Sequence, residues 1–356
     1  ADCFLHNRSK PGELKFALMQ GKRSWTTSRS KVIGLDTFHG MGIDIADLNG
    51  DLKLDMMISN ICSEFGFQES NLVFIHSGQD AGMSHGTAPF DEKSEGMGLS
   101  RGGWAWETRF GDFDNDGTLE VMQATGFTKG TINRWPELHE LLLSNEELAQ
   151  YPILYPFLGG DAEVAGHERN PFFVQHDGRY YDIAPQLALS EPENPMLSRG
   201  IATADVDGDG RLDFAVANNW EDSYFFQNTS DSAGGFLGLH LRLPLDVSAS
   251  SPDGLVIQAG HPDRSVPSLP AIGATAIVQL SDDSRPAMIG YVDGGTGHSG
   301  HRAPELHFGL GEVDKEARIS ATIAWRDRNG TVQKSELSDL APGWHTVMLY
   351  SDNANE

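Results

Sequence analysis

Residues 201–218 read IATADVDGDGRLDFAVAN, and the rest of the chain is best interpreted from this stretch. Four carboxylates occupy positions one, three, five and nine of a nine-residue loop: Asp205, Asp207, Asp209 and Asp213. Apolar, strand-like residues flank the loop on both sides, so we expect it to join two strands. Four negative side chains this close repel one another unless a cation lies among them. The spacing therefore predicts a cation-binding corner between two strands.

Calcium is the cation that suits this loop best. Ca²⁺ is bound by carboxylate and carbonyl oxygens in proteins. The backbone carbonyl of Arg211, at position seven, is expected to join the carboxylates as a ligand. Gly210 at position six permits the positive φ that a tightly wrapped loop needs.

The same loop occurs twice more, which makes it a repeat. We number the copies in chain order as loop 1 (residues 47–55), loop 2 (112–120) and loop 3 (205–213). The expected ligands of loop 1 are Asp47, Asn49, Asp51, Asp55 and the carbonyl of Lys53. Those of loop 2 are Asp112, Asp114, Asp116, Glu120 and the carbonyl of Thr118. We expect one Ca²⁺ in each loop, about three ions in all.

Loop 1 departs from the other two in ways that predict the weakest binding. Asn49 replaces one of the carboxylates, and Leu52 occupies position six, where loop 2 has Gly117. A leucine forced into the left-handed conformation costs about 1 kcal/mol relative to glycine.

The composition limits the classes of partner. The chain of 356 residues has 26 Lys and Arg against 51 Asp and Glu, a formal charge of −25. This argues against nucleic acid, because phosphate binding needs clustered basic residues. No apolar run approaches the length of a transmembrane helix. Calcium sites of this kind suit an extracellular or periplasmic location.

Each loop belongs to a longer unit of short strands. A strand precedes the loop, another follows it, and a further strand comes after an excursion, at residues 71–78, 170–184 and 222–230. Residues 4–7 and 13–19 are the strands of an earlier, incomplete unit. Repeated units of several short strands predict an all-β fold with propeller-type blades.

The second unit contains an unusually long excursion between Phe127 and Glu168. Pro136 suits a first helical turn, and Ser144 with Glu147 resembles a capping box, so two short helices are expected. Leucines recur there at roughly helical spacing, at Leu138, Leu141, Leu142 and Leu148. The excursion is either a lid packed on a blade or a surface for a partner or substrate.

The pattern changes after Ser230, and we place a domain boundary between residues 232 and 233. Leu237, Leu239, Leu241 and Leu243 alternate in a strand at residues 234–244, and a Ser, Pro and Gly-rich loop follows at 246–270. Five more strand-like segments come next, within residues 271–280, 286–295, 305–311, 319–327 and 345–350. Residues 233–356 are therefore predicted to form a β-sandwich or barrel.

These features together resemble a known combination of modules. The DxDxDG loops with their flanking strands resemble FG-GAP/VCBS repeats. This resemblance implies propeller blades with Ca²⁺ in the loops. Residues 271–274 (AIGA), 294–297 (GGTG) and 305–311 (ELHFGLG) resemble the ASPIC/UnbV domain. The whole chain is similar to the cartilage acidic protein family, which joins such a propeller to such a domain.

The repeat count differs from that family. Its propellers close with about seven blades, whereas this chain has three complete units and an incomplete one. Either further blades are too degenerate to read, or the chain is part of a longer protein or of a split assembly. An open propeller leaves sheet edges that a partner would cover.

Two groups of residues leave alternatives open. Cys3 and Cys62, the only cysteines, either form a disulfide in an exported protein or remain separate thiols. Trp104 and Trp106 either line a ligand surface or pack between blades.

Signals for catalysis are confined to one Gly-rich segment. His298, Ser299 and His301 resemble part of a nucleophile site, and His298, His301 and His307 offer imidazoles for a transition metal. A glycine-rich turn and a packed strand histidine account for the same residues.

The favoured interpretation is a calcium-binding extracytoplasmic protein that acts as a structural or binding module for a protein or carbohydrate partner. The alternatives are a subunit of a larger membrane-associated complex and an accessory enzyme of a biosynthetic pathway that uses the Gly-rich His/Ser segment. Whether the chain is an enzyme is left open.

Overall fold

The computed structural model describes most of the chain. The described residues are 4–7, 13–36, 38–63, 67–141, 146–187, 189, 196–231, 233–246, 251, 254–295, 297–327 and 330–350. Nearly all of their regular structure is β-strand, so the predicted all-β class is confirmed.

The described residues before 232 form four sheets of three to five strands, besides a two-stranded pair in the long excursion. The first contains β1 (Phe4–Asn7), β2 (Phe16–Gly21) and β7 (Thr87–Ala88). The second contains β3 (Ile43–Ala46), β4 (Asp55–Ile58), β6 (Leu72–His76) and β8 (Phe90–Glu92). The third contains β5 (Ile61–Cys62), β9 (Gly103–Gly111), β10 (Glu120–Thr125), β13 (Phe172–His176) and β14 (Arg179–Asp182). The fourth contains β15 (Ser198–Ala204), β16 (Asp213–Asn218) and β17 (Tyr224–Phe226).

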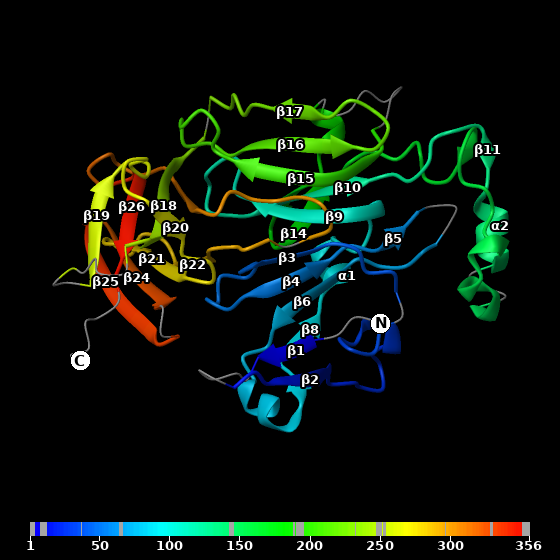
Figure 1. The fold of residues 1–356 in the computed structure, drawn as a ribbon, viewed down its shortest axis with the longest axis horizontal. Helices are drawn as coiled ribbons and strands as arrows, with labels where there is room; N and C mark the ends of the chain where they lie inside the picture. Colours follow the sequence, from blue (N-terminus) through cyan, green and yellow to red (C-terminus); the bar gives the residue numbers. More distant parts are fainter. Residues whose placement is uncertain are drawn as a thin grey trace.

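Successive sheets pack face to face because their strands are apolar on both faces. Neighbouring residues of a strand point to opposite faces. Met56 accordingly joins a core with the first sheet, while Met57 joins a core with the third. In β10, Val121 faces the second sheet and Met122 faces the fourth. The result is a stack of propeller-type blades, in which the incomplete unit expected near the N-terminus is a real sheet (Figure 1).

The C-terminal part has a core of its own between two sheets. One contains β18 (Gly235–Pro244), β19 (Leu255–Ala259), β20 (Ser268–Pro270), β23 (Leu306–Gly311) and β26 (Gly343–Leu349). The other contains β21 (Thr275–Leu280), β22 (Met288–Tyr291), β24 (Ile319–Arg326) and β25 (Val332–Leu340). Leu237, Leu239 and Leu241 of β18 are fully buried in this core. The alternation predicted for that strand is therefore confirmed at these three leucines, whereas Leu243 is only partly buried.

Three of the C-terminal strands were not expected. Residues 246–270 were predicted to be a loop, but β19 and β20 lie in this range. β19 pairs with β26 and β20 pairs with β18. Both are edge strands with exposed residues, so they lack the alternation of buried and exposed positions that marks a strand in a sequence. β25 was also missed.

Short helices occupy several connections, including the long excursion. They are η1 (Arg29–Lys31), η2 (Asp80–His85), α1 (Ser94–Met97), α2 (Trp135–His139), η4 (Glu146–Gln150), η5 (Pro152–Leu154) and η6 (Ala184–Gln186). Pro136 lies in the first turn of α2, as predicted. Ser144 of the expected capping box and Leu142 lie outside the described residues. The excursion also contains β11 (Ile132–Asn133) and β12 (Ala162–Glu163), which pair with each other.

The stack has two distinct ends (Figure 1). The C-terminal sheets lie at one end, next to the corners that join β9 to β10 and β15 to β16. The excursion with β11 and α2 lies at the other end. This arrangement brings the acidic loops, and not the excursion, against the C-terminal part.

In the described part of the chain, no helix has the length and apolarity that crossing a bilayer requires. Cys62 is a buried free thiol whose Sγ donates to the carbonyls of Glu69 and Ser100, each at 3.3 Å. Cys3, its possible disulfide partner, lies outside the described residues.

Candidate metal centres and the joint between the two parts

Each acidic loop closes an antiparallel strand pair at the same register. The residue before position one pairs with position nine: Ala46 with Asp55, Gly111 with Glu120, and Ala204 with Asp213. The three loops are therefore equivalent corners of three successive sheets.

The loop backbones share two left-handed positions. At position four φ is 74° for Gly50, 59° for Asn115 and 77° for Gly208. At position six φ is 64° for Leu52, 87° for Gly117 and 88° for Gly210. The sequence predicted the conformation at position six, including the strained Leu52. The conformation at position four was not predicted, although glycine and asparagine are the residues that adopt it most readily.

The carboxylate at position one organises the loop backbone. Asp47 accepts hydrogen bonds from the amides of Gly50 and Leu52, both at 2.8 Å. Asp205 does the same with Gly208 and Gly210, again both at 2.8 Å. In loop 2, Asp112 accepts from the amides of Asp116 at 3.0 Å and Gly117 at 2.9 Å.

The carboxylate at position nine ties the corner to the next strand of its sheet. Asp55 accepts from the amides of Leu48 at 2.9 Å and His76 at 2.8 Å, and His76 ends β6. Asp213 accepts from Val206 at 3.0 Å and Asn228 at 2.8 Å. In loop 2 the equivalent Glu120 accepts from the amide of Phe113 at 2.8 Å.

Two of the loops bring carboxylates close enough to share an ion. Ligand oxygens of Asp112, Asp114 and Glu120 lie within 4.8 Å of one another, as do those of Asp205, Asp207 and Asp213. In loop 1 the equivalent positions are Asp47, Asn49 and Asp55.

The predicted ligands at positions five and seven lie outside these groups. Asp209 forms an ion pair with the side chain of Arg211, and Asp116 accepts from the amide of Thr118 at 2.6 Å. Asp51 is exposed and accepts from the amide of Lys53 at 3.0 Å. Coordination by these residues, and by the carbonyls of Lys53, Thr118 and Arg211, stays a prediction.

Burial makes three of the loop carboxylates hard to ionise without a cation: Asp55 of loop 1, and Asp112 and Glu120 of loop 2. Desolvation, together with the neighbouring loop carboxylates, raises the pKa of Asp112 to about 7 and that of Glu120 to about 9, although backbone amides oppose both shifts. Desolvation also raises the pKa of Asp55 to about 6, although two backbone amides oppose this shift. A divalent ion would supply the nearby positive charge that favours the ionised form of these carboxylates.

Loops 2 and 3 form the surface on which the C-terminal part rests. His307 donates through Nε2 to the carbonyl of Gly210 at 3.0 Å, and Trp344 donates through Nε1 to Asp205 at 2.8 Å. The amide of Gly311 donates to the carbonyl of Asn115 at 2.7 Å, and Arg285 donates to the carbonyl of Asp116. The two loops are also joined directly, because Asn115 donates to the carbonyl of Gly210 at 2.9 Å.

The glycines of the LHFGLG segment fit this contact for a steric reason. A Cβ added to Gly309 would lie 2.0 Å from a carboxylate oxygen of Asp112 and 2.6 Å from the backbone of Asn115. A larger residue would therefore push the C-terminal strand β23 away from loop 2.

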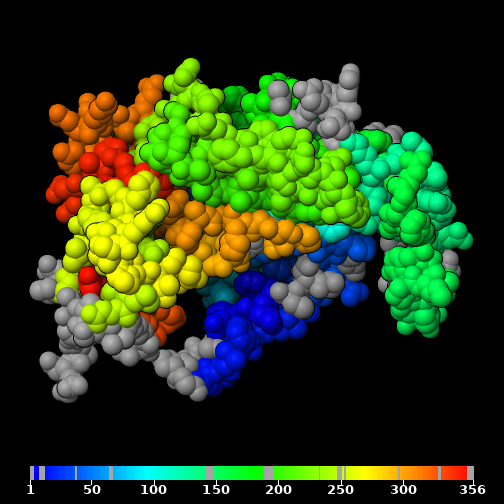
Figure 2. Space-filling view, turned by 45° about the horizontal axis from the view of Figure 1, so that its top comes forward, coloured from blue at the N-terminus to red at the C-terminus, as the bar shows by residue number. Residues whose placement is uncertain are grey.

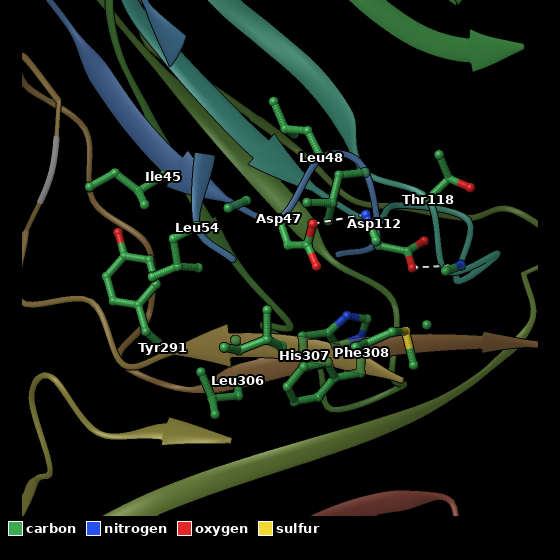
Figure 3. A pocket seen from close by; sticks show the side chains of 18 of the residues that line it. Ile45, Asp47, Leu48, Leu54, Asp112, Thr118, Tyr291, Leu306, His307 and Phe308 are labelled. Atoms are coloured by element: carbon green, nitrogen blue, oxygen red, sulfur yellow. Dashed lines mark hydrogen bonds between the residues drawn. The ribbon is translucent and has the colours of Figure 1, made fainter. Parts of the chain in front are cut away.

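A cavity of about 310 Å³ separates loop 1 from the C-terminal strands (Figure 3). Asp47 and Asp112 lie on one side of it, and Leu306, His307 and Phe308 lie on the other. Loop 1 thus faces the C-terminal part across a cavity, whereas loops 2 and 3 contact it.

A buried network of charges holds the Gly-rich segment against the stack. Arg302 is paired with Asp44 of β3 and lies 3.7 Å from Asp293. Arg109 of β9 is paired with Glu107 and lies 3.7 Å from Asp44. Burial raises the pKa of Glu107, while the charge of Arg109 opposes that shift. This network was not predicted from the sequence, although polar residues at alternate positions of β9, Glu107 and Arg109, were a signal for it.

The candidate catalytic residues lie in this same segment, at residues 294–303. The amide of Thr203 donates to the carbonyl of His301 at 3.1 Å, and that of Ala303 donates to the carbonyl of Thr203 at 2.9 Å. Figure 2 shows the orange segment running from the C-terminal sheets across the stack. A Cβ added to Gly300 would lie 2.0 Å from the carbonyl oxygen of Ile201, so this glycine permits a close backbone contact.

The histidines of this region do not converge. His298 is exposed and shares a hydrogen bond of 2.7 Å with Ser299, while His307 contacts loop 3. The groups of three metal ligands in the described residues are the acidic ones, so the alternative of a metal site at His298, His301 and His307 is not supported.

The two tryptophans pack as the structural alternative predicted. Trp104 is buried in an aromatic cluster and stacks on Phe127 at a centroid distance of 4.5 Å. Trp106 lies between that cluster and the guanidinium of Arg199, which is 4.6 Å from its ring centroid.

Comparison with protein families agrees with this architecture. A family model described as FG-GAP repeat matches residues 199–235, which contain loop 3. A family model described as ASPIC and UnbV matches residues 266–356. No curated protein matches the chain. The combination of modules expected from the sequence is confirmed, and loops 1 and 2 repeat the backbone geometry of the matched loop.

The strain at Leu52 predicts that Leu52→Gly stabilises the protein by about 1 kcal/mol relative to Leu52→Ala. Both substitutions remove the same side chain beyond Cβ, but only glycine relieves the left-handed backbone. Urea unfolding of the two variants measures the difference. Equal stability of the two would show that φ at this position carries no strain.

The raised pKa values predict opposite effects of pH with and without calcium. In the folded protein the pKa values of Asp55, Asp112 and Glu120 are all above about 4, which is the usual value for these groups in an unfolded chain. Without Ca²⁺ the stability they contribute is therefore complete below about pH 4 and is lost as the pH rises through 6 to 9. Ca²⁺ binds their ionised forms, so its stabilising effect grows over the same range. We expect the difference between calcium-loaded and chelated protein to be larger by roughly 2 kcal/mol or more at pH 8.5 than at pH 5.5. Urea unfolding at the two pH values gives this difference, and a gap that is independent of pH would contradict it.

The close contact at Gly309 predicts that Gly309→Ala lowers the free energy of unfolding by about 1 to 3 kcal/mol. Gly96→Ala is the matched control, because a Cβ at Gly96 meets no atom within 4 Å. Scanning calorimetry of both variants provides the test. A Gly309→Ala protein as stable as the control would mean that β23 does not rest on loop 2.

Proposed function

Because this chain joins an FG-GAP repeat to a C-terminal ASPIC/UnbV domain, we propose that it is a calcium-stabilised extracytoplasmic scaffold that presents a binding surface to another macromolecule. The observation that carries the proposal is the position of loops 2 and 3. Their clustered carboxylates lie at sheet corners, and their backbones accept the hydrogen bonds of the C-terminal part.

Calcium in these loops would act on both parts at once. An ion at Asp112, Asp114 and Glu120 removes the repulsion within loop 2 and fixes the carbonyls that receive Gly311 and Arg285. An ion at Asp205, Asp207 and Asp213 does the same for the loop that receives His307 and Trp344. Calcium would thus hold the sheet corners and keep the C-terminal domain docked.

The domain boundary belongs to this proposal. We divide the chain into blades at residues 1–232 and a C-terminal domain at 233–356. Two observations support the division: β18 is a central strand of the C-terminal core, and the apolar clusters between the blade sheets are separate from that core.

The excursion is the surface that we propose for a partner. Leu138 and Leu141 are buried, but further along Ile153 is 91% exposed and Phe157 is 77% exposed. Exposed apolar side chains that cluster on one segment are typical of interaction sites. The segment lies at the end of the stack opposite to the C-terminal domain, where a partner would not disturb the docked joint (Figure 1).

Removal of calcium tests the stabilising role. At a calcium concentration of one hundred times Kd, each site stabilises the folded state by about 2.7 kcal/mol. We therefore expect the melting temperature to fall by about 10 °C or more when calcium is chelated. Asp207→Asn should reduce this calcium effect, whereas the control Asp91→Asn, which removes an exposed carboxylate outside the loops, should preserve it. An unchanged melting temperature in chelator would refute the proposal.

Substitution of the exposed side chains tests the partner surface. Ile153→Ser combined with Phe157→Ser should change stability by no more than about 0.5 kcal/mol, because both side chains lack packing. Leu138→Ala in the same excursion should cost about 2 to 5 kcal/mol. Chemical unfolding compares them. If the serine variant is as unstable as Leu138→Ala, these residues belong to the core and do not form a surface for a partner.

A further inference from the structure

Two histidines face each other in the C-terminal domain, away from the expected ligands. His240 lies in β18, and His261 follows β19. Nε2 of His240 and Nδ1 of His261 are 2.9 Å apart. Two nitrogens that bind one zinc ion in tetrahedral geometry are about 3.3 Å apart, since each Zn–N bond is about 2.0–2.1 Å. A small movement would therefore let a metal ion take the place of the shared proton.

A carboxylate orients the inner histidine. Nδ1 of His240 lies 3.3 Å from Oε2 of Glu305. Histidines that bind metals usually donate their second ring nitrogen to a carboxylate, which fixes the tautomer and directs the other nitrogen at the metal. With its proton on Nδ1, His240 presents the lone pair of Nε2 to His261.

The two rings are also held by packing. Trp344 stacks on His240 with ring centroids 4.7 Å apart and lies 5.3 Å from the ring of His261. The indole is itself fixed by its hydrogen bond to Asp205. The site therefore has little freedom to lose when an ion binds.

The surroundings favour a cation and give it access. Burial lowers the pKa of His240 to about 4, so this ring is neutral at physiological pH. His261 is exposed to solvent, and a Cβ added to Gly208 of the acidic loop 3 would lie 3.5 Å from its Nε2. The negative charge of that loop attracts cations to the exposed histidine.

We propose that His240 and His261 bind a transition metal ion of the zinc and copper class, with Glu305 as the outer partner of His240. Imidazole suits both metals. The described residues bring no third His, Cys, Asp or Glu ligand atom into common reach of the pair. The remaining coordination positions are open to water or to a ligand atom. This site uses none of the ligands proposed for calcium, although it lies beside loop 3.

Copper titration of the full chain in the presence of saturating Ca²⁺ tests the site. Calcium occupies the hard oxygen ligands, so Cu²⁺ is directed to nitrogen. We expect one equivalent of Cu²⁺ to quench tryptophan fluorescence, because Trp344 contacts both rings. Electron paramagnetic resonance should show coupling to two imidazole nitrogens. His261→Ala should weaken binding at least tenfold and leave one coupled nitrogen; this side chain is exposed, so the fold is expected to survive.

His85→Ala is the control, since His85 is exposed and lies in η2, far from this site in the chain. It should bind Cu²⁺ as the parent protein does. If His261→Ala binds copper with unchanged affinity and an unchanged nitrogen signal, the copper is adventitious and the proposal is wrong. Zn²⁺ gives a second test, by melting temperature. A melting temperature that rises with Zn²⁺ in the parent protein but not in His261→Ala would show that the His240–His261 site also binds zinc.

Discussion

Repulsion among carboxylates crowded into three sheet corners is the constraint on which this structure depends. Loops 2 and 3 each bring oxygens of three carboxylates within 4.8 Å of one another, and in loop 2 two of these groups are almost completely buried. Backbone amides satisfy part of their hydrogen-bonding capacity, but amides do not cancel the net charge. In the account proposed here either protons or a cation would relieve this repulsion, and only a cation would do so at neutral and alkaline pH.

The same corners decide how the two parts of the molecule meet. The C-terminal domain rests on carbonyls of loops 2 and 3, and Gly309 lets its strand approach Asp112 closely. A second contact, the buried network of Arg109 and Arg302 with their carboxylate partners, fixes the Gly-rich segment across the stack. Breaking a buried ion pair by removing one partner is strongly destabilising, so this network resists separation of the segment from the stack. Glycines that suggested a catalytic turn are thus accounted for by a close backbone contact.

Much of this architecture could be predicted from the sequence because it depends on local patterns. The acidic spacing located the three corners, the alternating leucines located β18, and Leu52 was expected in the strained conformation that it adopts. The edge strands β19 and β20 could not be predicted, because they owe their structure to pairing with β26 and β18, far away in the chain. No sequence pattern links Trp344 to Asp205, because the two residues meet only in the folded chain. Contacts of this kind could not be predicted. The His240–His261 pair was missed for the same reason.

Anomalous scattering from crystals grown with CaCl₂ tests the central claim most directly. Difference maps collected at long wavelength should show a calcium peak among Asp112, Asp114 and Glu120, another among Asp205, Asp207 and Asp213, and a weaker one at loop 1. Loops without peaks, with their carboxylates turned into solvent, would contradict the account and leave the corners without the ions that are proposed to hold them.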